Sequence, residues 1–293
     1  MTTPSRTVPT TDALPPTVIQ PSRAWPKLGL RELWRHRELA EMLAVRDLRV
    51  RYKQALLGAA WAVLQPLLTM LVFNVLFGAL LGRSGKPTVP GIPYAVSTFC
   101  ALVPWQLFAR SLALGGNSLV ANKALITKVY FPRLITVVAP ILAALVDFAI
   151  AFAVLVGMML IYGIVPGPSV LFLPFFVLLA LVTALGVATW LSALNAMYRD
   201  VGYALPFLVQ LWMFVTPVLY TTERVMADQP EWLQLLYGLN PMAGVVEGFR
   251  WAMLGTGDPS WTVLSMSLTA ALLLLWTGMH VFRRLERSFA DLV

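Results

Sequence analysis

Six long apolar stretches dominate the pattern of hydrophobic and polar positions along this chain of 293 residues. They cover residues 61–81, 94–114, 134–162, 170–193, 201–221 and 261–282. A helix rises about 1.5 Å per residue and the hydrocarbon core of a bilayer is about 30 Å thick, so about 20 apolar residues are enough to cross it. The pattern therefore predicts an all-α membrane protein with six transmembrane helices. The composition, 58% hydrophobic and 12% charged, agrees with this prediction, because a soluble chain needs a polar surface.

The basic residues lie mostly on one side of the predicted membrane. Ten of the 22 Lys and Arg residues precede residue 54, whereas the long connection 222–260 contains five acidic residues. Further basic residues lie between stretches two and three, after stretch four and after stretch six: Lys123, Lys128, Arg133, Arg199, Arg283, Arg284 and Arg287. Because basic connections stay cytoplasmic, both termini are predicted inside, and the connections 82–93 and 222–260 outside. This distribution explains the net charge of +8 through membrane topology, so no nucleic acid partner is expected.

Residues 28–53 form a basic, amphipathic segment that follows a tail, 1–27, which is rich in Pro, Thr and Ser and predicted to be flexible. One helical face contains an apolar stripe: Leu30, Leu33, Trp34, Val45, Leu48 and Tyr52. Leu39, Met42 and Leu43 drift off this stripe, so two short helices fit the pattern as well as one. Such a segment lies in the headgroup plane of the membrane or packs as a soluble helix on a partner.

The cytoplasmic connection 115–133 is predicted to form a short basic helix that ends at Phe131-Pro132. An apolar set is flanked by Lys123 and Lys128: Leu125, Ile126, Val129 and Tyr130. This arrangement favours a helix that docks on another protein, although a plain tether is the alternative.

The outer connection 222–260 is too long for a simple turn. It contains two short apolar pieces, each of which is predicted to form a re-entrant or interfacial helix. Asn240 and Pro241 form a good N-cap and first-turn pair, and Gly255 is a good stop signal. Glu247 and Arg250 are spaced to pair on one helical face, and the connection as a whole suggests a lid over a pore.

Asp147 is the one acid in the middle of a stretch. It must face a cavity, pair with a partner or stay protonated. A structural or pore-facing role is favoured over proton transfer, because the other stretches offer no evident companions for a relay. Arg110, near the inner end of stretch two, is expected to extend to the cytoplasmic surface, and Cys100 is expected to be a small packing residue.

Chemically reactive patterns are missing from the sequence. His36 and His280 are the only histidines, and neither has a second ligand at metal spacing. The segment GRSGKPT at 82–88 lacks the spacing of a phosphate-binding loop. The chain is therefore expected to be neither an enzyme nor an ATPase by itself, to hold no cofactor or metal, and to take any energy for uphill transport from a partner or an ion gradient.

Large aromatic side chains run through stretches four and five. They are Trp190, Tyr198, Tyr203, Phe207, Trp212, Phe214 and Tyr220. Each of them alone is more readily explained by contact with lipid or by packing. Together they could line a wide path for sugar rings, whose C–H faces stack on aromatic planes.

Four strings in the chain resemble the ABC-2 type permeases that export polysaccharides such as O-antigen, teichoic acid and capsule. They are RDLRVRYKQALLGAAWAVLQPL at 46–67, NKALITKVYFPR at 122–133, NAMYRDVGYALPFLVQLWMFVTPVLY at 195–220 and LNPMAGVVEGFR at 239–250. They occur in the order that the family shows, and the resemblance covers about residues 30–290.

The resemblance implies a homodimer of six-span subunits in a bacterial inner membrane, each docked on a separate cytoplasmic ATPase that binds ATP and Mg. It implies a channel that a lipid-linked glycan reaches laterally or from the cytoplasm. Residues implied in coupling to the ATPase are Asn122, Lys123, Leu125, Ile126, Lys128, Tyr130, Arg133, Arg199 and Asp200. The cytoplasmic gate would comprise Arg46, Arg49, Arg51, Tyr52 and Lys53, whose arginines suit a lipid pyrophosphate or anchor the segment on anionic lipid. The outer gate would comprise Asn240, Pro241, Glu247 and Arg250.

The leading hypothesis from the sequence is therefore export of a lipid-linked polysaccharide that a partner ATPase drives. One alternative is an ABC-2 exporter of a small amphiphile or lipid. Another is an ATPase-independent channel or ion-coupled carrier. A membrane-embedded enzyme fits less well, since reactive residues are missing.

Overall fold

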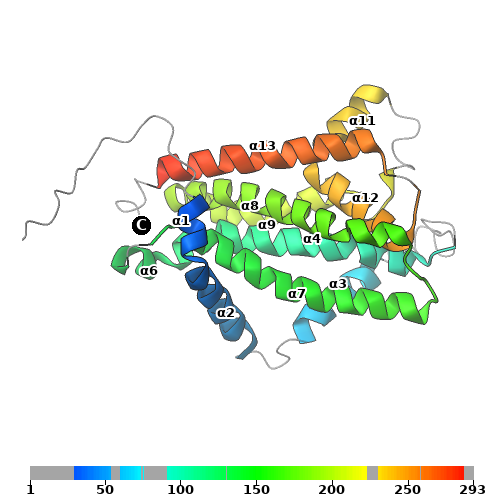
Figure 1. Cartoon of the computed structure of the whole chain (residues 1–293), viewed down its shortest axis with the longest axis horizontal. Coiled ribbons are helices and arrows are strands. Elements are labelled where there is room, and N and C mark those ends of the chain that lie inside the picture. Colours follow the sequence, from blue (N-terminus) through cyan, green and yellow to red (C-terminus); the bar gives the residue numbers. More distant parts are fainter. Residues whose placement is uncertain are drawn as a thin grey trace, which may run out of the picture.

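The computed structural model describes residues 30–53, 60–73, 75, 91–129, 131–222, 230–257 and 259–286. Within these ranges the regular structure is helical, as predicted (Figure 1). The helices are α1 (Leu30–Arg35), α2 (Arg37–Lys53), α3 (Ala60–Phe73), α4 (Tyr94–Gly116), α5 (Ser118–Ala121), α6 (Lys123–Lys128), α7 (Leu134–Ile161), the 3-10 helix η2 (Pro168–Phe172), α8 (Leu173–Met197), α9 (Asp200–Val215), α11 (Glu231–Gly238), α12 (Pro241–Leu254) and α13 (Trp261–Leu285). The predictions for the tail 1–27, Tyr130 and most of the connection 82–93 lie outside the described residues.

Each of the six predicted stretches contains one of the long helices: α3, α4, α7, α8, α9 or α13. Three segments of the described chain are long and apolar enough to cross a membrane, namely Leu134–Ile161, Pro168–Met197 and Trp261–Leu285. Val63–Val72 and Asp200–Val215 are shorter apolar helices. Helix α4 has 23 residues but includes more polar side chains than α7. The chain is therefore a multi-pass membrane protein, and the count of six spans stays a prediction.

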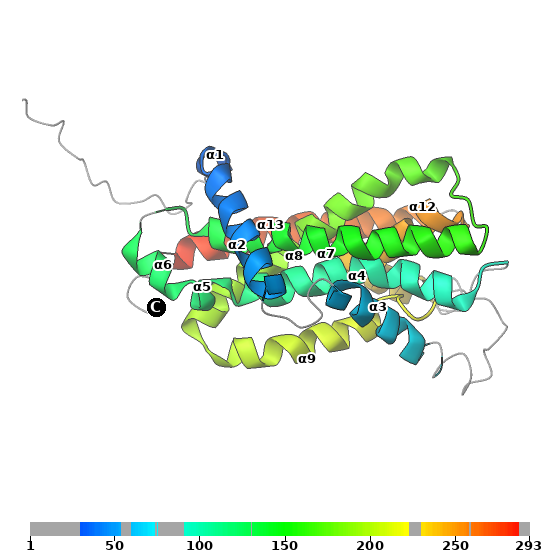
Figure 2. The ribbon, with the colours of Figure 1, turned by 90° about the horizontal axis from the view of Figure 1, so that it is seen from below.

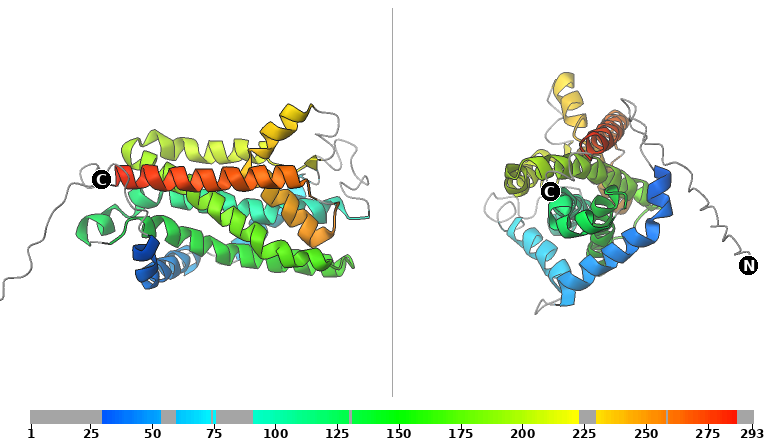
Figure 3. Two further views of the ribbon diagram at one scale, coloured as in Figure 1. Left: turned by 45° about the horizontal axis from the view of Figure 1, so that its top comes forward. Right: turned by 90° about the vertical axis from the view of Figure 1, so that its left-hand side faces the viewer.

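The long helices α4, α7, α8 and α13 run alongside one another and form the centre of the bundle (Figure 3). Helix α4 packs against both α7 and α8, and α8 packs against α13. Helices α9 and α3 flank α4 on one side of the bundle (Figure 2). Helices α1, α2 and α6 lie at one end, and α11 and α12 lie at the other (Figure 1). The predicted docking helix and the predicted outer lid therefore lie at opposite ends of the bundle.

Glycines allow α8 and α13 to approach closely. A Cβ atom added at Gly186 would lie 2.6 Å from the backbone nitrogen of Leu275, and one added at Gly278 would lie 2.3 Å from the carbonyl oxygen of Gly186. Small residues at helix crossings bring backbones together in membranes, where van der Waals contact rather than water exclusion drives helix association.

We expect Gly186→Val to destabilise the protein by about 1–3 kcal/mol or more, since over-packing forces the two backbones apart. Gly157→Ala in α7 is the matched control, because an added Cβ there meets nothing within 4 Å. The control should leave stability unchanged or raise it by up to about 1 kcal/mol. Thermal unfolding in detergent measures both, and equal melting temperatures would show that the close crossing does not limit stability.

The amphipathic segment forms two helices, α1 and α2, with a turn at His36. Trp34 of the predicted apolar stripe is 71% exposed, whereas Ala40, Leu43 and Ala44, which lie outside the stripe, are buried. These three residues pack on α7 together with Leu39 and Leu48, which are half-buried. The turn at His36 shifts the helical phase, and small alanines let α2 lie close to α7.

The predicted signals in the outer connection are confirmed. The Asn240 side chain caps α12 by accepting a hydrogen bond from the backbone nitrogen of Met242. Pro241 occupies the first turn, and Gly255 ends the helix with φ +63°. Helix α12 is mostly buried against α4, α8 and α13, so this connection folds into the end of the bundle.

Candidate functional site

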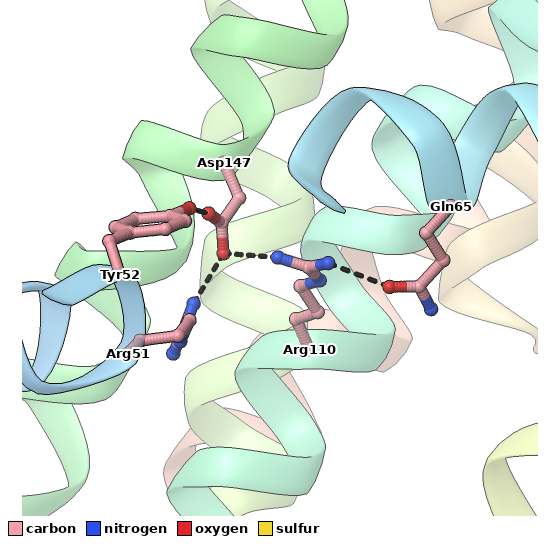
Figure 4. A network of polar contacts seen from close by, with 5 residues as sticks. All are labelled: Arg51, Tyr52, Gln65, Arg110 and Asp147. Carbon is pink, nitrogen blue, oxygen red and sulfur yellow. Dashed lines mark hydrogen bonds and ion pairs between the residues drawn. The ribbon is translucent and has the colours of Figure 1, made fainter. Parts of the chain in front are cut away.

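A buried carboxylate on α7 joins four helices of the bundle (Figure 4). Asp147 is 5% exposed and accepts hydrogen bonds from Arg51 and Tyr52 of α2 and from Arg110 of α4. Both guanidinium contacts are made by Oδ2 at 2.5 Å, whereas the Tyr52 hydroxyl donates to Oδ1. Arg110 also donates from Nη2 to Gln65 of α3, at 2.8 Å. We call these five residues the Asp147 cluster.

The electrostatics of the Asp147 cluster explain how a charge is tolerated within an apolar bundle. A carboxylate moved out of water is costly unless it is paired and hydrogen-bonded. Asp147 has two cationic partners and one hydroxyl partner. Burial and the hydrogen bond to Asp147 raise the pKa of Tyr52, so its hydroxyl keeps its proton and remains a donor.

Pairing was one of the three predicted states of Asp147, and the structure confirms it. The partner on the neighbouring helix is Arg110, which forms an ion pair with Asp147. Arg110 is turned into this contact rather than toward the cytoplasmic surface, which corrects its predicted position. A charge in each of two adjacent apolar stretches was the signal that could have revealed the pair, since opposite charges within spans usually meet.

The five residues of the predicted cytoplasmic gate divide into two groups. Arg51 and Tyr52 belong to the Asp147 cluster, whereas Arg46, Arg49 and Lys53 are exposed. Arg46 pairs with Asp47 and donates to the Asn122 side chain at 2.8 Å. Their role toward a lipid pyrophosphate stays a prediction.

The contact between Arg46 and Asn122 connects α2 to the start of α6. Within α6, Leu125 and Ile126 are half-buried and pack toward the contact between α2 and α7. The exposed residues of α6 and its end are Lys123, Ala124, Thr127, Lys128 and Val129. The structure therefore assigns the two apolar residues to packing and leaves the two lysines on the open face.

The other predicted coupling residues lie near the same end of the bundle. Arg133 donates to the backbone carbonyl of Glu286, so the segment after α6 is attached to the end of α13. Arg199 and Asp200 are exposed at the turn between α8 and α9. Asn195 anchors this turn by donating to the Asn117 side chain at 2.8 Å, a contact that sequence reasoning did not identify.

At the opposite end, Asn240 and Arg250 attach the outer helices to the end of α9. Asn240 accepts a hydrogen bond from the Trp212 indole at 2.9 Å and donates to Thr216 at 3.1 Å. The side chain of Arg250 is buried and donates to the carbonyl oxygens of Pro217 at 2.9 Å, Val218 at 3.4 Å and Tyr220 at 3.5 Å.

Two of the four predicted outer-gate residues, Asn240 and Arg250, form hydrogen bonds with the end of α9 or with the turn that follows it. The other two lie within α12, where Pro241 is buried and Glu247 is half-buried. Pairing of Arg250 with Glu247 was predicted from spacing, whereas backbone carbonyls receive the Arg250 hydrogen bonds described here.

The predicted channel aromatics do not share one surface. Tyr203, Phe207 and Phe214 are exposed along one face of α9, by 84%, 62% and 49%. Trp212 lies on another face and packs edge-on against Phe108. The remaining three lie elsewhere: Trp190 donates to Thr277 of α13, Tyr198 is exposed at the end of α8, and Tyr220 donates to the carbonyl oxygens of Phe214 and Val215. A common sugar-binding path stays a prediction.

Within the described part of the chain, no group of three or more His, Cys, Asp or Glu side chains is placed to hold a metal ion.

Comparison with known proteins identifies relatives over nearly the whole chain. It is 28% identical over 262 residues to the O-antigen export system permease protein RfbA of Myxococcus xanthus, covering 89% of this chain and 98% of the relative. It is 26% identical over 257 residues to the protein of that name from Klebsiella pneumoniae, covering 87% and 95%. The polysialic acid transport protein KpsM of Escherichia coli is 24% identical over 254 residues, covering 85% and 93%. The profile of the ABC-2 type transporters matches residues 38–254, well over half of the sequence, and the chain therefore belongs to the ABC-2 type transporter family.

Proposed function

We propose that this chain is the permease subunit of an ABC transporter that exports a lipid-linked, O-antigen-like polysaccharide across a bacterial inner membrane. The observation that carries the proposal is the near full-length match to permeases named for O-antigen export and polysialic acid transport. The family implies a separate ATPase subunit, which supplies the nucleotide site that this sequence lacks.

The proposed topology has six spans, with both termini in the cytoplasm. Three helices meet the length and hydropathy of a span, and α3, α4 and α9 would cross beside them. The basic helix α6 would then lie on the cytoplasmic side and the re-entrant helices α11 and α12 on the outer side. Both ends of the bundle agree with the positive-inside rule.

In the proposed mechanism the open face of α6 binds the ATPase, and two copies of the permease form the working unit with two copies of the ATPase. Lys123 and Lys128 are exposed there, and Arg46 joins α6 to α2. A movement of α6 would thus be transmitted to the cytoplasmic gate on α2 through the hydrogen bond between Asn122 and Arg46. Asn240 and Arg250 would hold the outer gate against the end of α9.

The exposed apolar face of α9 supports the proposed homodimer. Tyr203, Phe207 and Phe214 lie on this face, and Leu68 and Leu71 of α3 are also exposed. These helices flank the same side of α4 (Figure 2). A second copy would cover these side chains within the membrane.

The test is transport by the purified complex. The permease is co-expressed with its ATPase subunit, identified by co-purification, and the complex is reconstituted into vesicles. We expect a defined lipid-linked glycan to stimulate ATP hydrolysis and to cross the membrane in an ATP-dependent manner. Complexes with an ATPase variant that cannot hydrolyse ATP provide the control. Glycan movement by the permease alone would contradict the proposal, and stimulation by small amphiphiles instead of glycan would favour the alternative exporter class.

A further inference from the structure

The Asp147 cluster has more positive than negative charge. Arg51 and Arg110 are each paired with one carboxylate, so the three ionised groups have a formal net charge of +1. An arginine has five N–H donors. Among the described residues, Arg51 uses one of them on Asp147, and Arg110 uses one on Asp147 and one on Gln65. The cluster therefore retains both charge and donors for a further anion.

The cationic side of the cluster is open, whereas the anionic side is closed. The side chains of Arg51 and Arg110 are 27% and 23% exposed, but that of Asp147 is 6% exposed. Beside Asp147, the recess between α4 and α7 is narrow, and its lining combines apolar side chains such as Val103 and Phe148 with Gln106 and Arg110. An anion can thus reach the guanidiniums from the open side, but it must take the place of the carboxylate to receive all three donors.

The site lies deep along the bundle. Asp147 is thirteen residues after the start of α7 at Leu134, which places it about 20 Å along that helix. Helix α2 runs obliquely and brings Arg51 and Tyr52 to this depth (Figures 1 and 4). An anion that reaches this position within a membrane needs a hydrophobic carrier or a path through the protein.

We propose that Arg51, Tyr52 and Arg110 form a binding site for the phosphate oxyanion of a lipid head group, and that Asp147 occupies this site as an internal competitor until the lipid displaces it. The proposal rests on the proposed function, because a lipid-linked substrate brings such a group to this depth. Planar guanidiniums bind phosphate oxygens bidentately, and a pyrophosphate has more charge and more acceptors than one carboxylate. Displacement of Asp147 removes the ion pair that joins the end of α2 to α7, while the apolar contacts of Ala40, Leu43 and Ala44 remain, so binding of the lipid would loosen this end of the cytoplasmic gate.

The test measures binding of farnesyl diphosphate to the purified full-length chain in detergent, without the ATPase. Asp147→Asn keeps the side-chain shape and removes the competing charge, so we expect about tenfold tighter binding, which corresponds to 1.4 kcal/mol. A purely structural ion pair predicts the opposite, because loss of its carboxylate would disorder the arginines. Equal or weaker binding by a folded Asp147→Asn variant would therefore overturn the proposal.

A second variant tests the proposal even if Asp147→Asn does not fold. Gln65→Glu is nearly isosteric and places a second carboxylate beside Arg110, which lowers the formal net charge of the cluster from +1 to zero. We expect about tenfold weaker binding of the probe, and unchanged binding would count against the site. Glu286→Gln is the matched control, because this carboxylate pairs with Arg283 at the end of α13 and should not affect the probe.

Parallel titrations with inorganic pyrophosphate and phosphatidylglycerol identify the source of the oxyanion. If farnesyl diphosphate binds more tightly than both inorganic pyrophosphate and phosphatidylglycerol, the ligand of the site is a lipid that contains a pyrophosphate. Equal binding of inorganic pyrophosphate, or tighter binding of phosphatidylglycerol, would overturn that part of the proposal. ATP-driven export by the Asp147→Asn complex is measured separately, so failure of the site is distinguishable from failure of the proposed function.

Discussion

Reversing the charge of both exposed lysines of α6, by Lys123→Glu with Lys128→Glu, should abolish ATP-driven export while the permease still folds. The two side chains lie on the open face of a short helix whose apolar residues, Leu125 and Ile126, pack inward. Exposed charges contribute little to stability, so the bundle should melt at an unchanged temperature. Like charges brought together at an interface cost several kcal/mol, and each 1.4 kcal/mol is a tenfold loss of affinity.

We therefore expect at least about a hundredfold weaker binding of the ATPase, loss of export and loss of stimulation by substrate. Co-purification, ATP hydrolysis and vesicle transport measure these three effects. Arg284→Glu is the control, because Arg284 is exposed in the last turn of α13, at the same end of the bundle as α6, and its replacement reverses a positive charge in the same way (Figure 1). Normal export by the double variant would show that α6 is not the coupling helix.

The second large effect is expected for Arg250→Leu at the outer end. Arg250 is 3% exposed, and its guanidinium donates hydrogen bonds to the carbonyl oxygens of Pro217, Val218 and Tyr220. Among the described residues, no backbone N–H donates to these three carbonyls, and leucine offers them no donor. A buried polar group that loses its partner costs about 1–3 kcal/mol, so the variant should lose about 3 kcal/mol or more.

Thermal unfolding of the purified permease measures the loss, and export by the reconstituted complex should fall with it. Arg284→Leu, an exposed position on α13, should change stability by no more than about 0.5 kcal/mol. The loss of stability caused by Arg250→Lys should lie between the losses caused by Arg250→Leu and Arg284→Leu, since an ammonium has three donors but lacks the planar fork of arginine. A melting temperature of Arg250→Leu equal to that of Arg284→Leu would mean that the carbonyls find other donors.

Both predictions concern elements that lie in connections between long helices, and the sequence identified them because their polarity differs from that of the spans. Helix α6 follows a basic pattern within 115–133, and α12 begins at the Asn240 and Pro241 signal. Capping and local charge depend on a few neighbouring residues, so they can be recognised from the sequence without the fold.

The side chains and carbonyl groups that contact these two helices could not be predicted from the sequence in the same way. Leu125 and Ile126 were predicted to face the ATPase; the fold shows that both are half-buried against the bundle, and their role toward the ATPase stays a prediction. Arg250 was expected to pair with Glu247 three residues away; the fold also brings it to three carbonyl oxygens that lie thirty or more residues earlier. Spacing along one helix identifies residues on a common face, but it does not show what the neighbouring element presents to that face.

The sequence by itself determined that the chain is a helical membrane protein, where most of its long helices begin, and to which family it is similar. These properties follow from local hydropathy, charge and capping. Only the tertiary structure decided that Arg51, Tyr52 and Arg110 meet at Asp147, because these residues are 37 to 96 positions away along the chain. Their meeting depends on how α2 and α4 cross α7, and that geometry is set by packing between helices rather than by any one of them.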